Sequence, residues 1–514
     1  MTIVENSLIC RFFLALWGAL TDAWAESRVG NALRAFGRGF ARCVKGSAVC
    51  QFIWREGTLP KSWETSLTCR VLTFILNIPC AVCRWIYGLR KEVWDGSLTF
   101  RAVAGLGAMP YLCLGGFMAL MLMVPHSNWD NRWALMGAVA LIALFALGCA
   151  IRPGNRLEIG ALGPWLTLFM AFVCYAFLAS LSWSMSLRFV GFYLAAFLLC
   201  LLAVSGVKKY EQVEMMVILV AAGLTVAALY GCYQGVIGVE VVANQQDMSV
   251  NAGMPGRVYA FFDNPNNFAE LLVMLSPLNY ALLLNAKTWR GRVGALFSLG
   301  VCVIALGVTY SRSGWLGFAL ATVVFIAFCN WKLIPLLAVL GICCIPLLPE
   351  TIYNRILTIG NMEDSSTSYR FAIYGASGVL MKDYWYRGVG LGSDILTKTF
   401  KGYPPMFDGN FPIHTHNNYL QVWAEMGPGG IITFLCMLLS QLKTGIRAYA
   451  AGTDRRVKNL LAAAVAGFCG ILLISVAEYT WFYARNMFVY FFLFGLIAAC
   501  VKLCRKSVRD EEAQ

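Results

Sequence analysis

The chain has 514 residues, of which 59% are hydrophobic and only 13% are charged, and its mean hydropathy is +0.65. A soluble core of this length needs less apolar surface, so much of the chain should face lipid and a water-soluble globular domain is excluded. The formal net charge of +14 is typical of basic residues at the inner membrane face, not of a nucleic-acid-binding protein. We therefore expect an all-α integral membrane protein.

The first hundred residues, 1–100, are predicted to form a cytoplasmic or interfacial amphipathic region. Apolar residues recur at helical spacing across 29–44 with Arg and Lys opposite them, which indicates a helix on the anionic inner leaflet. The apolar run at 71–83 is short for a span and favours an interfacial or re-entrant segment. No cleavable signal peptide is expected, because an arginine interrupts the apolar stretch at 8–20.

The rest of the chain, 101–514, is predicted to be a transmembrane domain with about twelve spans. They are expected near residues 102–125, 134–151, 161–183, 189–206, 215–238, 269–286, 293–311, 314–330, 333–348, 427–442, 460–482 and 486–503. Lys and Arg gather in alternate connections, so those connections and both termini should be cytoplasmic. The opposite, extracytoplasmic face receives an Asn-rich loop at 239–268 and a large loop at 349–426, before the last three spans. Loops of that length usually carry function.

The stretch "NFPIHTHNNYLQVWAEMGPGG", residues 410–430, concentrates polar side chains at the end of the large loop. It holds His414 and His416, two of the three histidines in the protein. A histidine beside an asparagine is more often a hydrogen-bonded loop residue than a base. No third ligand stands at convincing spacing from this H-x-H pair, and the 19 cysteines are scattered through apolar runs and are interpreted as small buried hydrophobic residues, so we expect no metal site.

Four segments together carry a resemblance to a known family. His416 and Asn417 begin the pattern H-N-x9-G-x-x-G, and the other three segments are "GRVYAFFDNPNNFAELL" (256–272), "YSRSGWLGF" (310–318) and "SYRFAIYGASGVLMKDYWYRGVGLGS" (368–393). In the order in which they occur along the chain, with the His416 segment last, they resemble the landmarks of the O-antigen ligase and O-antigen polymerase superfamily. The resemblance extends from about residue 100 to the end. The resemblance implies a membrane glycosyltransferase that uses a polyprenyl-diphosphate-linked glycan and needs no nucleotide, metal or other cofactor.

Such a transfer requires a base near the acceptor hydroxyl and positive charge on the departing phosphates. A histidine takes up a proton near neutral pH, so His416 is the candidate catalytic base. The planar fork of arginine matches phosphate oxygens, which makes Arg312 and Arg370 candidates for the diphosphate, with Arg257 as a third. Arg312 could equally be an arginine that snorkels at a helix junction.

Further side chains are candidates for lining the substrate site. His414 could orient a substrate or line the cavity. Asn264 and Asn266 lie in a sequence that also reads as a turn and helix start, and their amides could reach sugar hydroxyls. Asn417 adjoins the candidate base.

The sequence thus predicts a glycosyltransferase of the cytoplasmic (inner) membrane with its active site on the extracytoplasmic face. The acceptor would be a second carrier-linked glycan in a polymerase or a lipid A core in a ligase, and the motifs do not decide between them. Membrane lipids are the other expected partners. A transporter or flippase for lipid-linked glycans and a membrane acyltransferase stay as alternatives. A transporter favours ionisable residues at the bilayer midplane, and acyl transfer has no need of paired arginines.

Overall fold

A computed structural model describes residues 47–55, 57–242, 253–361 and 365–512, together with some positions between 15 and 46. All regular elements in this described part are helices, with no strand among them, which confirms the predicted all-α class. The chain divides into two compact units, Met1–Thr58 and Leu59–Gln514. Most of the amphipathic helix predicted at 29–44 lies outside the described residues.

The helices in the first part of the chain are α3 (Ala48–Trp54), α4 (Thr58–Trp63), α5 (Leu67–Leu76), α6 (Ile78–Leu89), α7 (Lys91–Gly96), α8 (Leu98–Gly107), α9 (Pro110–Met123), η1 (His126–Asn128), α10 (Asn131–Ile151), η2 (Ile159–Leu162), α11 (Pro164–Leu178), α12 (Trp183–Ser205) and α13 (Tyr210–Ile237). Those that follow are α14 (Pro265–Leu275), α15 (Leu278–Asn285), α16 (Trp289–Val308), α17 (Arg312–Asn330), η3 (Trp331–Leu333), α18 (Ile334–Cys344), η4 (Ile345–Leu347), α19 (Glu350–Leu357), α20 (Ser365–Tyr384), α21 (Ser393–Phe400), α22 (Asn418–Ala451), α23 (Arg455–Ile474) and α24 (Ala484–Glu512).

Within the described residues, nine helices are long and apolar enough to cross a membrane, or up to eleven if two bent pairs each count as one span. The protein is therefore a multi-pass membrane protein, although the predicted count of twelve is not confirmed. One bent pair is α8 with α9, which fall in the span expected at 102–125 but meet at 77°. The other is α5 with α6, bent by 48°, over the apolar run at 71–83.

Three other expected spans have different boundaries in the structure. The spans predicted at 314–330 and 333–348 form one nearly continuous helical run, Arg312–Leu347. The span predicted at 460–482 ends early, because α23 stops at Ile474 and a non-helical connection, 475–483, follows it. This second difference matters for function, since the connection holds Glu478.

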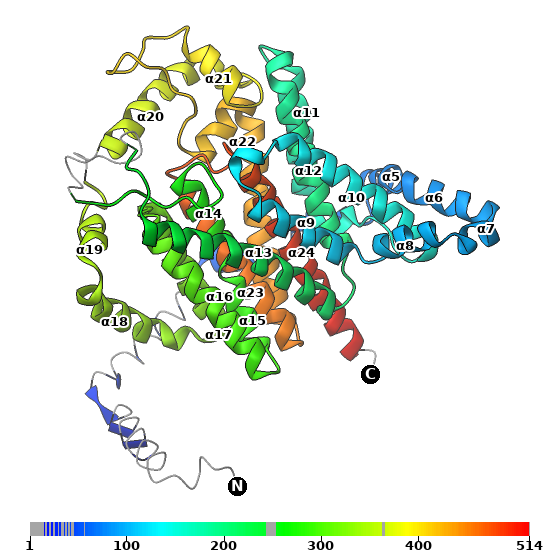
Figure 1. Ribbon diagram of the computed structural model, residues 1–514, viewed down its shortest axis with the longest axis horizontal. Coiled ribbons are helices and arrows are strands. Elements are labelled where there is room, and N and C mark those ends of the chain that lie inside the picture. Colours follow the sequence, from blue (N-terminus) through cyan, green and yellow to red (C-terminus); the bar gives the residue numbers. More distant parts are fainter. Residues whose placement is uncertain are drawn as a thin grey trace. The chain divides into compact units, whose positions relative to one another are not determined.

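The C-terminal helices form the centre of the bundle in Leu59–Gln514. Helix α24 is apolar all round and is 94% buried over its most apolar stretch, as expected of a helix surrounded by other helices. It packs against α12, α22 and α23, and aromatic side chains such as Phe488 and Tyr490 are fully buried on it. In Figure 1, α22 to α24, coloured orange to red, lie among the other helices. This packing supports the connections at their ends.

A kink in α22 lies just after the histidine-containing stretch. Pro428 has no N–H to donate to the carbonyl of Ala424 four residues earlier, and the amide of Val389 donates to that carbonyl instead at 2.8 Å. Gly427 has φ 69° and ψ −167° at the kink. The facing Gly388 also has positive φ, and a Cβ on it would lie 2.4 Å from the Glu425 carbonyl oxygen. Glycines at these two positions let the 386–390 segment pack directly on the backbone of α22.

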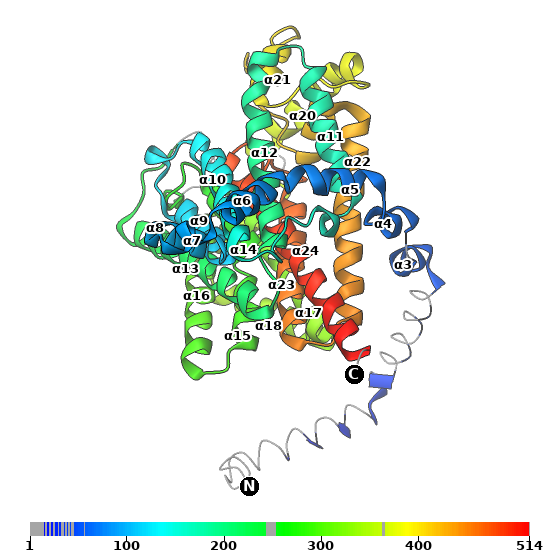
Figure 2. The ribbon, with the colours of Figure 1, turned by 90° about the vertical axis from the view of Figure 1, so that its right-hand side faces the viewer.

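The long segment before α22 folds into helices of its own, α19 to α21. A small apolar cluster, separate from the main core, holds α20 and α21 to the start of α22; its buried members are Leu380, Met381, Val389, Ile395, Leu396, Phe400 and Ala424. Figure 2 shows α20 and α21 at the same end of the molecule as the beginning of α22. The segment therefore forms a packed layer beside the histidine-containing stretch.

Candidate functional site

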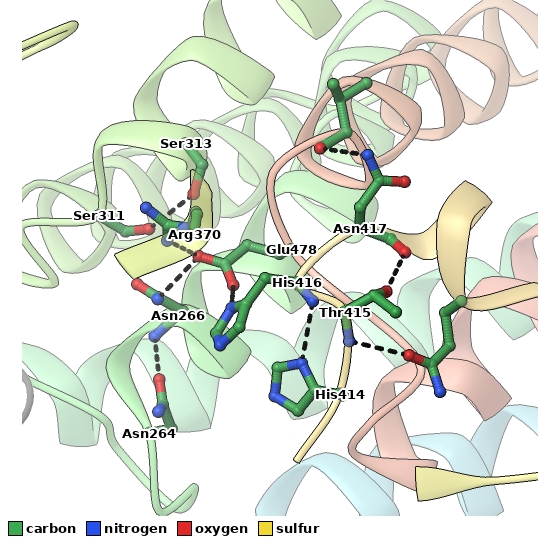
Figure 3. Close-up of polar contacts among 12 residues, drawn as sticks. Asn264, Asn266, Ser311, Ser313, Arg370, His414, Thr415, His416, Asn417 and Glu478 are labelled. Atoms are coloured by element: carbon green, nitrogen blue, oxygen red, sulfur yellow. Dashed lines mark hydrogen bonds and ion pairs between the residues drawn. The ribbon is translucent and has the colours of Figure 1, made fainter. Parts of the chain in front are cut away.

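Four connections and one helix bring polar side chains together at one end of the bundle. They are the approach to α14, the turn between α16 and α17, the stretch before α22, the connection between α23 and α24, and α20. Figure 3 shows Asn266, Arg370, His416 and Glu478 pointing toward one another. These residues are up to 212 positions apart in the chain, so only the fold creates the cluster.

Glu478 lies at the centre of the cluster and accepts from three side chains. One oxygen, Oε1, is ion-paired with Arg370 and also accepts from the amide of Asn266 at 3.2 Å. The other oxygen, Oε2, lies 3.2 Å from Nδ1 of His416. The side chain of Glu478 is only 8% exposed, against 21% for Arg370 and 29% for His416. The carboxylate is thus the buried anchor, and the two basic side chains extend from it toward solvent.

The surroundings of Glu478 keep its carboxylate charged. Burial alone would raise the pKa, but the positive charge of Arg370 and the hydrogen bond from His416 outweigh burial and lower the pKa of Glu478 to about 2. A permanently charged carboxylate favours the tautomer of His416 that carries its proton on Nδ1.

His416 occupies a special backbone position. Its φ is 48°, a left-handed conformation that residues other than glycine adopt rarely and at a cost of about 1–3 kcal/mol. In the described part of the chain the other non-glycine residues with positive φ are Ala260 and Tyr310, which lie in two of the connections that meet here. With Nδ1 directed to Glu478, Nε2 of His416 makes no hydrogen bond to any described residue and is available as a proton acceptor.

His414 has a different environment from His416. Its ring packs against Phe482, with centroids 4.5 Å apart, and against Tyr479 at 5.8 Å. Burial lowers the pKa of His414 to about 3, and the neighbouring His416 adds to that effect, so the ring stays neutral. Its Nδ1 accepts from the backbone N–H of His416 at 3.2 Å. In the structure His414 holds the backbone of His416.

A buried chain of hydrogen bonds holds the same backbone from the other side. The N–H of Thr415 donates to the side-chain oxygen of Gln421 at 3.0 Å, and the amide of Gln421 donates to Glu425 at 2.7 Å. The hydroxyl of Tyr374 in α20 donates to the carbonyl of His416 at 3.2 Å. Such contacts account for how His416 is kept in an unfavourable conformation.

The remaining predicted arginines lie near this cluster. Arg257 is buried and donates to the side-chain oxygen of Asn266 at 2.6 Å. Asn266 in turn donates to Glu478, so Arg257 is linked to the carboxylate through Asn266. Arg312 donates to the carbonyl of Thr358 at 2.8 Å, so one nitrogen of its guanidinium group binds the segment after α19. Burial lowers the pKa of Arg257, and so do the charges of Arg355, Arg312 and Arg370, while Glu478 opposes them. Four guanidinium groups therefore share one electrostatic environment with one carboxylate.

The three predicted asparagines differ in their contacts. Asn266 bridges Arg257 and Glu478, as described above. Asn264 is the N-cap of α14 and accepts from the N–H of Asn266 at 2.8 Å. Asn417 is the N-cap of α22, and its amide donates to the carbonyl of Val476 at 2.9 Å. The two caps position the helix ends that carry Asn266 and His416.

The sequence reasoning missed two residues of this site, Glu478 and Arg355. Glu478 fell inside the span predicted at 460–482, and an ionisable residue in a predicted span is itself a sign of function. Arg355 is buried, and its Nε lies 3.4 Å from the carbonyl oxygen of Tyr310. Nothing in the local sequence of Arg355 distinguishes it from other basic residues of the large loop.

Comparison with known proteins bears on the part of the chain that carries these arginines and histidines. Residues 295–435 match the O-antigen ligase family. This O-antigen ligase region contains Arg312, Arg370, His414 and His416, whereas Arg257 and Glu478 lie outside it. The match confirms the resemblance drawn from the sequence motifs.

Two curated relatives agree with this match. A protein of Rickettsia conorii is 27% identical over 186 residues, or 34% of this chain and 43% of that protein. A second, from Rickettsia felis, is 25% identical over 218 residues, or 40% of this chain and 51% of that protein. Both are provisionally named polysaccharide ligases, and the chain spans about half the length of each or less. Together with the O-antigen ligase region, they support a membrane polysaccharide-processing enzyme.

Among the described residues, no three His, Cys, Asp or Glu side chains gather in a way that could hold a metal ion. The cluster instead offers a proton acceptor with a carboxylate behind it and several guanidinium groups beside it. A proton acceptor can activate a hydroxyl, and guanidinium groups can bind phosphate oxygens.

Proposed function

We propose that the protein transfers a glycan from a polyprenyl diphosphate carrier to a hydroxyl of a second glycan or of a lipid A core. The observation that carries this proposal is the arrangement of His416, Glu478 and Arg370, in which a base with a free Nε2 lies beside a guanidinium on one buried carboxylate. The O-antigen ligase region and the names of the rickettsial relatives support the substrate class.

The chemistry balances with the side chains present. Nε2 of His416 takes the proton of the acceptor hydroxyl, and the hydroxyl oxygen attacks the anomeric carbon of the donor sugar. The bond from that carbon to the diphosphate oxygen breaks, and the polyprenyl diphosphate leaves with the electron pair. Glu478 stabilises the imidazolium that results, as a carboxylate does behind a histidine base in other enzymes. One displacement of this kind inverts the anomeric configuration.

The arginines bind the diphosphate in this proposal. Arg370 is the first candidate because it is partly exposed and adjoins the base, so a phosphate oxygen can take the place of its contact with Glu478. Arg312 is the second and Arg257, which is buried behind Asn266, the third. His414, Asn264, Asn266 and Asn417 complete the substrate lining that we propose.

The test is the reaction itself. The full chain in nanodiscs is supplied with a polyprenyl-diphosphate-linked oligosaccharide and a glycan acceptor, and release of free polyprenyl diphosphate is followed together with the anomeric configuration of the product. Release coupled to an inverted linkage, in the presence of a chelator and without nucleotide, is the expected result. A transporter would move the donor without releasing diphosphate, and an acyltransferase would leave the diphosphate linkage intact, so either outcome refutes the proposal.

We also propose that the site faces the extracytoplasmic side of the inner membrane, with both termini in the cytoplasm. The basic connections support this orientation, because Lys and Arg accumulate in cytoplasmic loops. A cysteine introduced by Asp408→Cys in the large loop should react with an impermeant thiol reagent in intact cells, and one introduced by Arg455→Cys should not. Reaction at position 455 and protection at 408 would place His416 in the cytoplasm.

A further inference from the structure

A cavity with many charged side chains in its lining lies far from His416, near the other end of α24. Its volume is about 860 Å³, and it is formed by α5, the segment 156–161 at η2, and the second half of α24. Six of its seventeen lining residues are basic, namely Arg70, Arg156, Lys502, Arg505, Lys506 and Arg509. Three carboxylates, Glu64, Glu158 and Asp510, also line it.

Helix α24 separates this basic cavity from the candidate active site. The connection that carries Glu478 leads into α24 at Ala484, whereas Lys502 lies in the second half of the same helix. At a rise of 1.5 Å per residue the two positions are about 27 Å apart along the helix, close to the thickness of the hydrocarbon core. The basic cavity therefore lies across the membrane from the base and takes no part in the transfer step.

The carboxylates in the cavity neutralise only part of its charge. Lys502 is 3.0 Å from Glu158, and Arg505 is 3.7 Å from Glu64. The remaining basic side chains, Arg70, Arg156, Lys506 and Arg509, form no ion pair with any carboxylate of the described residues. Six cations against three carboxylates leave a surplus of positive charge that an anion can bind.

Most of the remaining lining is apolar, and this apolar surface indicates what kind of anion the cavity can bind. Phe74, Leu157, Ala161, Ala498 and Val501 contribute hydrocarbon surface next to the basic side chains. A volume of about 860 Å³ lies within the range of pockets that bind organic ligands and exceeds what one inorganic ion needs. Basic pockets between membrane helices on the cytoplasmic side are suited to anionic lipid headgroups, because phosphate binds the cations and the glycerol and acyl carbons bind the apolar wall.

We propose that this basic cavity binds a phosphate ester, supplied by the headgroup of an anionic phospholipid. Binding would join the N-terminal α5 to the C-terminal α24 through one shared anion. The proposal does not depend on the reaction at His416, and its test measures binding and not turnover.

The test uses the full chain in a neutral detergent and native mass spectrometry, which counts bound lipid molecules. Phosphatidylglycerol and phosphatidylcholine are titrated in parallel, and inorganic phosphate is then added as a competitor. The cavity variant is Arg505→Gln with Arg509→Gln. The matched control is Lys287→Gln with Arg290→Gln, which removes the same charge from exposed side chains outside the cavity. Thermal unfolding of each variant without lipid shows that both are folded.

We expect phosphatidylglycerol to bind the parent and the control with equal affinity, and phosphatidylcholine to bind far more weakly. Each cation near an anionic lipid surface contributes about fivefold in affinity, so the cavity variant should bind phosphatidylglycerol roughly 25-fold more weakly. Competition by inorganic phosphate at a concentration similar to that of the lipid would show that the cavity recognises free phosphate and not a lipid headgroup, and would overturn the assignment to a phospholipid. Equal affinities in the cavity and control variants, or equal binding of the two lipids, would overturn the proposal.

Discussion

Replacing Glu478 by glutamine tests the role of the buried carboxylate behind His416. Glutamine keeps the shape of the side chain and can still accept from Arg370 and Asn266, but it has no charge to stabilise an imidazolium. The contact that changes is the one at 3.2 Å between Oε2 and Nδ1 of His416. A hydrogen bond to a charged group contributes about 1.5–3 kcal/mol, which corresponds to roughly 10- to 150-fold in turnover.

The position of Glu478 behind His416 and beside Arg370 limits the changes in kcat and KM that we expect for Glu478→Gln. Glu478 acts on the proton transfer through His416, so that contribution cannot exceed the ~10²–10⁴-fold of a general base. The same change also weakens the ion pair that holds Arg370 in the absence of substrate, which makes the guanidinium more available to a diphosphate. We therefore expect kcat to fall while KM for the donor stays unchanged or decreases.

The assay is the initial rate of polyprenyl diphosphate release as a function of donor concentration. Glu350→Gln is the matched control, since Glu350 is an exposed carboxylate at the start of α19 and should give the parent values. If Glu478→Gln turns over within about twofold of the control, or if it raises KM with kcat unchanged, the carboxylate does not act through the base. Either result would refute the reasoning.

Three other contacts lead to predictions about donor kinetics, the free energy of unfolding and stability in acid. Arg370→Lys and Arg312→Lys keep the positive charge but lose the planar guanidinium, which can bind two phosphate oxygens at once. Each change should therefore lower kcat/KM for the donor about tenfold or more. Parent-like values in both variants would show that these arginines do not bind the diphosphate. Gly388→Ala should lower the free energy of unfolding by about 1–3 kcal/mol more than Gly409→Ala does, because both glycines have positive φ but only the Cβ at position 388 would meet a carbonyl oxygen, at 2.4 Å. Equal losses in the two variants, measured by chemical or thermal unfolding, would contradict this. In the folded protein the pKa of Glu478 is lowered from 4.5 to about 2. The charged carboxylate therefore stabilises the folded state above pH 4.5, and about 3 kcal/mol of the free energy of unfolding is lost as the pH falls toward 2. Acid-dependent thermal unfolding should show that loss in the parent but not in Glu478→Gln, and identical acid profiles would argue against it.

Part of this site was predictable from sequence because its residues lie in motifs. The histidine-containing stretch and the segment around Arg370 are recognisable locally, and the structure brings Arg370 and His416 onto the same carboxylate. Hydropathy also identified most helices, because an apolar run of about 20 residues has few alternatives to spanning a membrane.

Glu478 could not be placed from sequence for a physical reason. A hydropathy window averages over about 19 residues, and the apolar residues of 475–483 hide the turn that follows α23. The three partners of Glu478 lie 62, 108 and 212 positions away, and no local pattern carries such a pairing. The contact of Arg312 with Thr358 was hidden in the same way.

The central claim is that His416 is the base, and a comparison of the two histidines tests it most directly. Single-turnover transfer from a polyprenyl-diphosphate-linked glycan is measured for the parent, His416→Ala and His414→Ala, with donor binding measured separately. The account predicts that His416→Ala loses about 10²–10⁴-fold in transfer rate with donor binding nearly intact. His414→Ala, which removes a support of the His416 backbone and one side chain of the proposed substrate lining, should lose less. Transfer by His416→Ala within a few-fold of the parent, or a greater loss in His414→Ala, would contradict it.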